Sequence, residues 1–75
     1  MYLLTQDRRE LLQFSRVTIS HTLGGKAILC AYTPDCDNTL NYVTIGTYRD
    51  EASAAAELLR ITEALRSGVA VYEVN

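Results

Sequence analysis

The chain has 75 residues, of which 48% are hydrophobic and 21% charged. This length is below the roughly 100–150 residues of a typical domain, and the composition is that of an ordinary globular protein. Several domains and general disorder are therefore excluded, and we expect one small domain over residues 1–75. Seven basic and nine acidic residues give a net charge of −2, which excludes a general binder of DNA or RNA polymers because polyanions would not be attracted.

The chain carries no pattern typical of membrane insertion, secretion or metal binding. No apolar run approaches the roughly 18 residues that cross a bilayer, and residues 1–10 lack the features of a signal peptide, so we expect a cytoplasmic protein without a membrane partner. Cys30 and Cys36 do not form a CxxC motif, and His21 is the only histidine. We expect no metal or cofactor, with Cys30 in the core and Cys36 in a loop.

Apolar runs separated by turn residues predict an antiparallel β-meander in the first part of the chain. Residues 2–5 and a longer run, residues 11–19, flank the polar segment 6–10, which is the pattern of a β-hairpin. The apolar positions of the longer run change parity near Ser15-Arg16. Because side chains alternate between the faces of a strand, this change predicts a β-bulge or a bend there.

Two further strands, one helix and a closing strand complete the expected order β-β-β-β-α-β. The strands are residues 26–33, 42–48 and 69–74, and Asp50 and Gly68 are suited to begin and end a helix of about 17 residues. The apolar helix positions are Ala54, Leu58, Ile61 and Leu65, with Glu57, Arg60 and Glu63 outside this stripe. The predicted class is α+β, with the helix packed on one face of the sheet.

The second face of the sheet also needs a partner, because residues 26–33 are apolar on both sides. Five tyrosines add aromatic side chains with polar tips, a type that is frequent at interfaces and around ligands. We therefore expect a homo-oligomer, a dimer or a tetramer. A strongly twisted sheet that encloses its own second face is the alternative.

The residues that could perform chemistry are few. His21 lies at the edge of a glycine-containing turn, where we expect an exposed residue and not a catalytic base. Asp35 and Asp37 lack the further ligands of a calcium loop and fit a turn. Gly24-Gly25-Lys26 precedes a strand, whereas a phosphate-binding P-loop precedes a helix. We therefore predict a protein that is not an enzyme and has no catalytic residue.

Arginines close to aromatic residues are the better candidates for a binding site. An arginine beside an aromatic ring can stack on a base and donate two hydrogen bonds to a phosphate or carboxylate. The predicted ligand-binding residues are Arg8, Arg9, Arg16, Tyr32, Tyr48 and Arg49. The alternative for each arginine is a solvated surface charge.

Three short motifs resemble those of a group of small phage- and prophage-encoded proteins. Thr5-Gln6-Asp7-Arg8 matches the Ser/Thr-Gln-Asp-Lys/Arg opening of the group. Ile45-Gly46-Thr47-Tyr48 matches the Leu/Ile-Gly-x-Tyr that precedes its helix, and Val71-Tyr72-Glu73 matches the Val-Tyr-Glu near its end. The resemblance implies an origin in a mobile element.

Compact oligomeric phage proteins of this size include inhibitors of bacterial immunity that sequester the nucleotide signals of systems such as CBASS and Thoeris. The resemblance thus implies a homo-oligomer that binds a nucleotide second messenger, of the cyclic oligonucleotide or cyclic ADP-ribose type, without cleaving it. The alternatives are an interaction module that docks a host protein through its apolar and tyrosine-bearing sheet face, and a purely structural phage protein. A hydrolase of the same signals is the least favoured.

Overall fold

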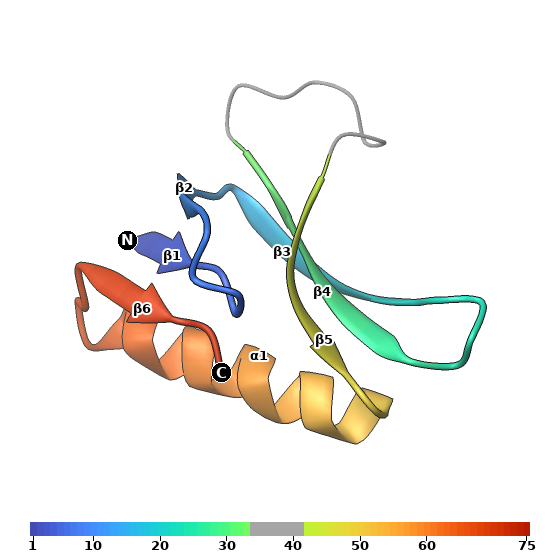
Figure 1. Ribbon diagram of the computed structural model, residues 1–75. Coiled ribbons are helices and arrows are strands. Elements are labelled where there is room, and N and C mark those ends of the chain that lie inside the picture. Colours follow the sequence, from blue (N-terminus) through green and yellow to red (C-terminus); the bar gives the residue numbers. More distant parts are fainter. Residues whose placement is uncertain (34–41) are drawn as a thin grey trace.

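The computed structural model describes residues 1–33 and 42–75 and folds them into two three-stranded sheets and one helix (Figure 1). The elements are β1 (Tyr2–Leu4), β2 (Leu11–Gln13), β3 (Arg16–His21), β4 (Ala27–Tyr32), β5 (Val43–Tyr48), α1 (Glu51–Arg66) and β6 (Val71–Glu73). The predicted α+β class is confirmed, because α1 packs against the antiparallel sheet β3-β4-β5. Among the described residues, no helix is long and apolar enough to cross a membrane.

The sheet β3-β4-β5 contains a bulge that the sequence pattern did not predict. Leu29 on β4 faces Gly46 on β5, and the next residue, Cys30, faces Thr44, so Ile45 is an extra residue on β5. A bulge places two successive residues against one partner. Ile45 and Gly46 are consequently both buried, although successive residues of a regular strand alternate between faces.

The second sheet has the order β2-β1-β6, with β1 antiparallel to β2 and parallel to β6. The expected break near Ser15-Arg16 is therefore more than a bulge, because the chain leaves one sheet there and enters the other. The predicted four-stranded meander is divided into the pair β1-β2 and the sheet β3-β4-β5. This division gives Leu12 a buried position beside Leu3, while Val17 and Ile19 pack against the core from β3.

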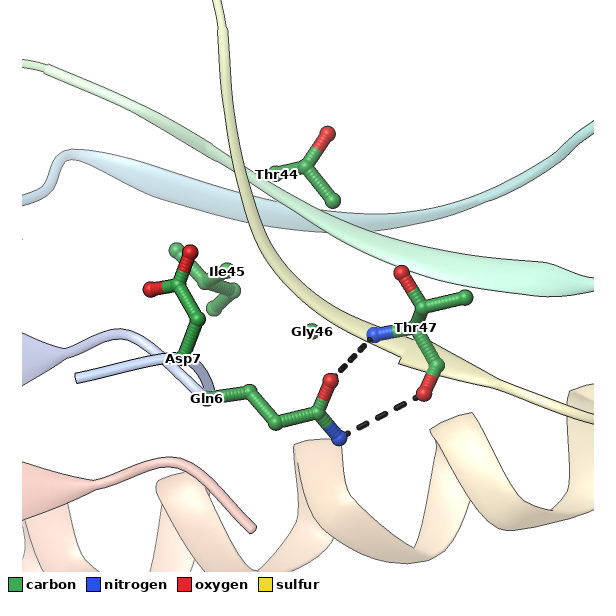
Figure 2. Close-up of a pocket in the computed structure, with 6 residues that line it drawn as sticks. All are labelled: Gln6, Asp7, Thr44, Ile45, Gly46 and Thr47. Atoms are coloured by element: carbon green, nitrogen blue, oxygen red, sulfur yellow. Dashed lines mark hydrogen bonds between the residues drawn. The ribbon is translucent and has the colours of Figure 1, made fainter. Parts of the chain in front are cut away.

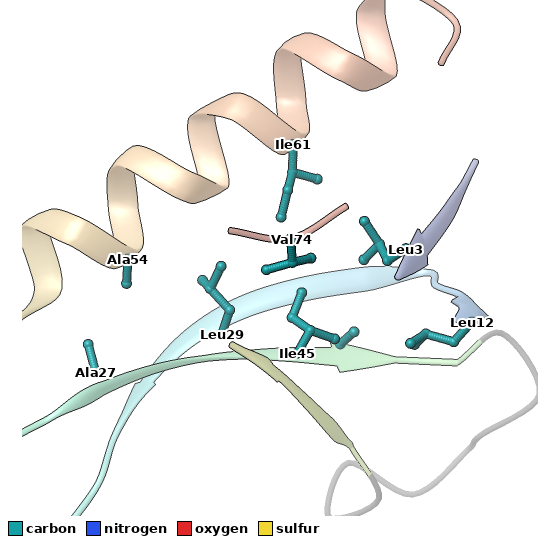
Figure 3. Packing of buried hydrophobic residues seen from close by; sticks show 9 residues of the cluster. Leu3, Leu12, Ala27, Leu29, Ile45, Ala54, Ile61 and Val74 are labelled. Atoms are coloured by element: carbon teal, nitrogen blue, oxygen red, sulfur yellow. The ribbon is translucent and has the colours of Figure 1, made fainter. Parts of the chain in front are cut away.

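The helix begins and ends where its capping residues predict. The Asp50 carboxylate accepts a hydrogen bond of 2.8 Å from the Ser53 backbone N–H, and Gly68 follows the helix with φ +75°. The buried hydrophobic cluster lies between α1 and the two sheets (Figure 3). Its buried members are Leu3, Leu12, Ala27, Leu29, Ala31, Ile45, Ala54, Ile61 and Val74.

The buried face of α1 differs from the predicted stripe. Glu57 was expected outside it but is 0% exposed, whereas Leu65 was expected inside it and is 53% exposed. The buried helix residues are Ala54, Glu57, Ile61 and Ala64. They are spaced three and four residues apart, as the predicted stripe was, and therefore form one continuous face of the helix. Glu57 occupies this face because the C-terminal residues supply hydrogen-bond donors for its carboxylate.

Candidate functional site

A stacked arginine and two tyrosines lie at one end of the sheet β3-β4-β5. The antiparallel register places Arg16, the first residue of β3, opposite Tyr32, the last residue of β4. The Arg16 guanidinium carbon lies 4.1 Å from the centroid of the Tyr32 ring, and the centroids of Tyr32 and Tyr42 are 5.9 Å apart with an interplanar angle of 56°. Arg16 and Tyr42 are exposed, so this cluster is accessible to a ligand.

The cluster belongs to the sheet face that points away from α1. Leu29 and Ala31 on β4 belong to the core, so the alternation of side chains places Cys30 and Tyr32 on the opposite face. Cys30 is buried on that face, and burial raises the pKa of its thiol, which keeps the thiol neutral and poorly nucleophilic. The prediction that Cys30 is buried is therefore confirmed. Cys36, which was predicted to lie in a loop, is outside the described residues.

Two of the predicted ligand-binding residues instead contact the C-terminal end of the chain. The Arg8 guanidinium donates a hydrogen bond of 3.1 Å to the Val74 carbonyl and lies 3.6 Å from the Glu73 carboxylate. The Tyr48 phenol donates a hydrogen bond of 2.8 Å to the Asn75 carbonyl. These contacts attach the residues that follow β6 to the rest of the fold, which is a structural role for both side chains.

The remaining two predicted residues lie apart from the cluster. Arg9 is exposed in the β1-β2 turn, and its guanidinium makes no hydrogen bond or ion pair with the part of the chain that the structure describes. The Arg49 side chain is 89% exposed, with its Nε 3.5 Å from an Asp50 carboxylate oxygen. Of the six predicted residues, the structure therefore brings together Arg16 and Tyr32 and adds Tyr42, which was not among the six.

His21 has the exposed position at the end of β3 that the sequence predicted, and its Nε2 lies 3.0 Å from the Glu51 carboxylate. Within residues 1–33 and 42–75, no group of three or more His, Cys, Asp and Glu side chains is placed to hold a metal ion. Asp35 and Asp37 lie outside these residues.

A hollow of about 230 Å³ lies between the β1-β2 turn and β5 (Figure 2). The Gln6 side chain borders it and pairs with the Thr47 backbone: its Oε1 accepts from the Thr47 N–H at 2.9 Å, and its Nε2 donates to the Thr47 carbonyl at 3.4 Å. The Gln6 backbone N–H also donates to the Ile45 carbonyl at 2.8 Å. Gln6 thus gives the outer edge of β5 the hydrogen bonds that a neighbouring strand would supply.

Glu57 centres a second polar network that the sequence did not reveal. One carboxylate oxygen accepts hydrogen bonds from the Tyr72 phenol at 2.8 Å and the Asn75 backbone N–H at 2.9 Å, and the other accepts from Arg60 at 2.7 Å. Burial, followed by the charge of Glu57, raises the pKa of Tyr48 to about 12. Burial and the hydrogen bond to Glu57 also raise the pKa of Tyr72. One sequence signal could have revealed this position: residues 54, 57, 61 and 64 are spaced three and four apart and therefore lie on one face of the helix.

The first of the three motifs in the phage-protein resemblance contacts each of the other two. Gln6 of the first motif pairs with Thr47 of the second, and Arg8 of the first contacts Glu73 of the third. Comparison of the chain with protein-family models, curated proteins and solved structures finds no match in any of the three. The relation to phage proteins thus stays a prediction that rests on these motifs.

Proposed function

We propose that this protein binds and sequesters a nucleotide second messenger, of the cyclic oligonucleotide or cyclic ADP-ribose type, and does not cleave it. The observation that carries the proposal is the position of the Arg16 guanidinium over the Tyr32 ring, with Tyr42 beside it, where Arg16 and Tyr42 are exposed. Aromatic rings and guanidinium planes stack on nucleobases, and a guanidinium edge donates paired hydrogen bonds to phosphate oxygens. One cluster therefore offers both contacts that a nucleotide needs.

The proposal includes a homo-oligomer. A single copy of the described chain contributes one guanidinium to the cluster, because Arg8 contacts Glu73 and Val74, and Arg9 and Arg49 lie elsewhere. Symmetric assembly of identical chains multiplies such a site without any further residue. A phage origin, immune evasion and a location in the bacterial cytoplasm follow from the motif resemblance and are part of the same proposal.

Binding can be tested by thermal unfolding with a panel of cyclic dinucleotides, cyclic trinucleotides and cyclic ADP-ribose isomers. A ligand that binds only the folded state stabilises it by about 2.7 kcal/mol when its concentration is one hundred times its Kd, and the melting temperature rises as a result. We expect one nucleotide class to do so for the wild type and not for Arg16→Ala. Arg49→Ala is the control, because it removes the same charge at an exposed position away from Tyr32. A panel with no effect on the wild type would contradict the proposal.

A second candidate function is the docking of another protein, and a different surface favours it. The outer face of β2-β1-β6 carries Tyr2, Leu11 and Val71, which are each more than two fifths exposed. Exposed apolar side chains grouped on one face are typical of interaction sites. Leu11→Lys is expected to remove binding to a protein partner and to leave nucleotide binding at Arg16 intact, whereas Arg16→Ala is expected to do the opposite. These two variants therefore separate the two candidate functions.

A further inference from the structure

We infer that the outer edge of β3 pairs with β3 of a second copy of the chain, so that their three-stranded sheets join into one continuous sheet. The inference rests on the proposed function in one respect, the homo-oligomer, for which it names the interface. Two features of β3 support it: the open backbone groups of its outer edge, and an order of side chains that is complementary to itself.

The outer edge of β3 carries backbone groups that are open to a further strand. Among the described residues, β4 is the one strand that pairs with β3. The Thr22 N–H, directly after β3, donates to the Lys26 carbonyl at 2.9 Å, so the even-numbered residues of β3 direct their backbone groups toward β4. These directions alternate along a strand, and Val17, Ile19 and His21 therefore direct their N–H and C=O groups to the outer edge.

The two edges of the sheet β3-β4-β5 differ in their protection. On β5, the Gln6 side chain occupies both backbone groups of Thr47. On β3, Arg16 and His21 stand at the two ends, and the residues between them are uncharged. Proline, lysine and inward-pointing charges usually protect an edge strand, and β3 contains none of these. An edge of this kind is a site for pairing with another chain.

The side chains of β3 match those of a second β3 that runs in the opposite direction. If Thr18 lies on the two-fold axis, Val17 of each copy lies opposite Ile19 of the other, and Arg16 lies opposite Ser20. Val17 and Ile19 are half-buried and pack against the core, so this pairing extends the apolar layer of both copies. Moving the axis by one residue in either direction would place one of these apolar side chains opposite a polar one.

This register can be tested with a disulfide at residue 18. Val17 and Ile19 would exchange backbone hydrogen bonds, so Thr18 lies at a position without them, where opposite Cα atoms are about 4.5 Å apart. Disulfides join Cα atoms about 4.4–6.8 Å apart, and a cysteine at residue 18 would therefore be placed to bond to its own counterpart.

The first experiment is mild oxidation of Thr18→Cys, followed by non-reducing electrophoresis and intact mass spectrometry. The background is Cys30→Ala and Cys36→Ser, because Cys30 faces residue 18 within the same copy. We expect a covalent dimer. Ser20→Cys in this background is the matched control: it shares the face of residue 18, but its counterpart would lie roughly 13 Å away along the strands, which a disulfide cannot span.

The second experiment measures the dimer without a disulfide, by analytical ultracentrifugation at several protein concentrations. Thr18→Lys places two like charges opposite each other on the axis and is expected to raise the dissociation constant roughly fivefold, whereas Thr44→Lys, at an exposed position on β5, leaves it unchanged. In the wild type, exchange of the Val17 and Ile19 amides is expected to slow as the protein concentration rises.

The outcomes separate the interface from the nucleotide binding of the proposed function. A wild type that stays monomeric, or equal cross-linking at residues 18 and 20, would overturn the inference. A dimer that is insensitive to Thr18→Lys would use another surface and would also overturn it, whether or not a nucleotide binds. A dimer that cross-links at residue 18 and binds no nucleotide would support the inference and contradict the proposed function.

Discussion

The ring of Tyr48 lies directly against Gly46, two residues earlier on β5: a Cβ atom at residue 46 would be 2.5 Å from the Tyr48 phenolic oxygen and 2.9 Å from Cζ. The ring cannot move aside freely, because its phenol donates a hydrogen bond to the Asn75 carbonyl. Gly46→Ala is therefore expected to lower the free energy of unfolding by about 1–3 kcal/mol, the cost of overpacking a filled site. Urea denaturation followed by circular dichroism would measure the loss.

Two controls make this prediction specific. A Cβ at Gly24 would meet its nearest atom, the Thr22 hydroxyl, at 3.8 Å, so Gly24→Ala is expected to be close to neutral. In a Tyr48→Ala background, Gly46→Ala is expected to cost much less, because the obstructing ring is gone. Equal costs in both backgrounds would show that Tyr48 is not the reason for glycine at this position.

The Tyr48 phenol also predicts how stability changes in alkaline solution. Its pKa is raised from the ordinary value of 10.0 to about 12 in the folded protein, so the stability it contributes is fully present below pH 10. Between pH 10 and about 12 the unfolded chain loses this proton first, and the contribution is lost as the pH rises. Tyr48→Phe should therefore lose stability less steeply over this interval.

The measurement is the free energy of unfolding of both proteins at several pH values. Tyr72, whose pKa is also raised, remains in the variant and keeps part of the alkaline dependence. At neutral pH, Tyr48→Phe is expected to be less stable than the wild type by about 0.5–1.5 kcal/mol, because the hydrogen bond to Asn75 is absent. Parallel pH profiles of the two proteins would contradict the assignment.

The buried Glu57 carboxylate is expected to be essential for stability. Glu57→Ala leaves the Tyr72 phenol and the Asn75 N–H without their acceptor and is expected to cost about 1–3 kcal/mol, the cost of leaving polar groups without their hydrogen-bond partner. Glu57→Gln keeps the volume and one acceptor oxygen, so its loss should be smaller and measurable even if the alanine variant does not fold. Denaturation by urea would rank the variants.

Glu63 provides the matched control for Glu57. It forms the same type of pair, with Arg66 three residues later at 2.9 Å, but both side chains are largely exposed. Exposed pairs of this kind contribute little, so Glu63→Ala is expected to change stability by less than about 0.5 kcal/mol. A Glu57→Ala variant as stable as Glu63→Ala would show that the buried network does not hold the C-terminal residues.

Local signals explain which parts of the fold were predictable. The Asp50 cap and Gly68 define the helix correctly because capping depends on neighbouring residues only. The apolar positions of residues 11–19 change parity near residue 15, which correctly predicted that the strand is interrupted there. It could not show that β2 and β3 belong to different sheets, because the choice depends on the parallel pairing of β1 with β6, at the other end of the chain.

The candidate site was partly predictable for the same reason. Arg16 and Tyr32 face each other across neighbouring strands, so the register of one hairpin brings them together. Arg8 and Tyr48 each met the criteria for a ligand-binding residue, but their partners are Val74 and Asn75, which are 66 and 27 residues away in sequence. Composition and spacing do not reveal such contacts.

Gln6 is expected to protect the outer edge of β5. Its amide occupies both backbone groups of Thr47, and an edge strand without such a partner is open to pairing with another chain. Gln6→Ala should therefore speed hydrogen exchange at the Thr47 amide and increase self-association at high protein concentration. Amide exchange followed by nuclear magnetic resonance and analytical ultracentrifugation would measure the two effects.

Gln6→Glu separates the two hydrogen bonds of the Gln6 amide. The carboxylate can still accept from the Thr47 N–H, whereas it cannot donate to the Thr47 carbonyl and would repel it. Protection of the Thr47 amide is thus expected to be largely kept in Gln6→Glu and lost in Gln6→Ala. Since the bond to the carbonyl is the longer one, at 3.4 Å against 2.9 Å, its loss should be the smaller effect on stability. Unchanged exchange at Thr47 in Gln6→Ala would mean that the edge of β5 is protected by another part of the fold.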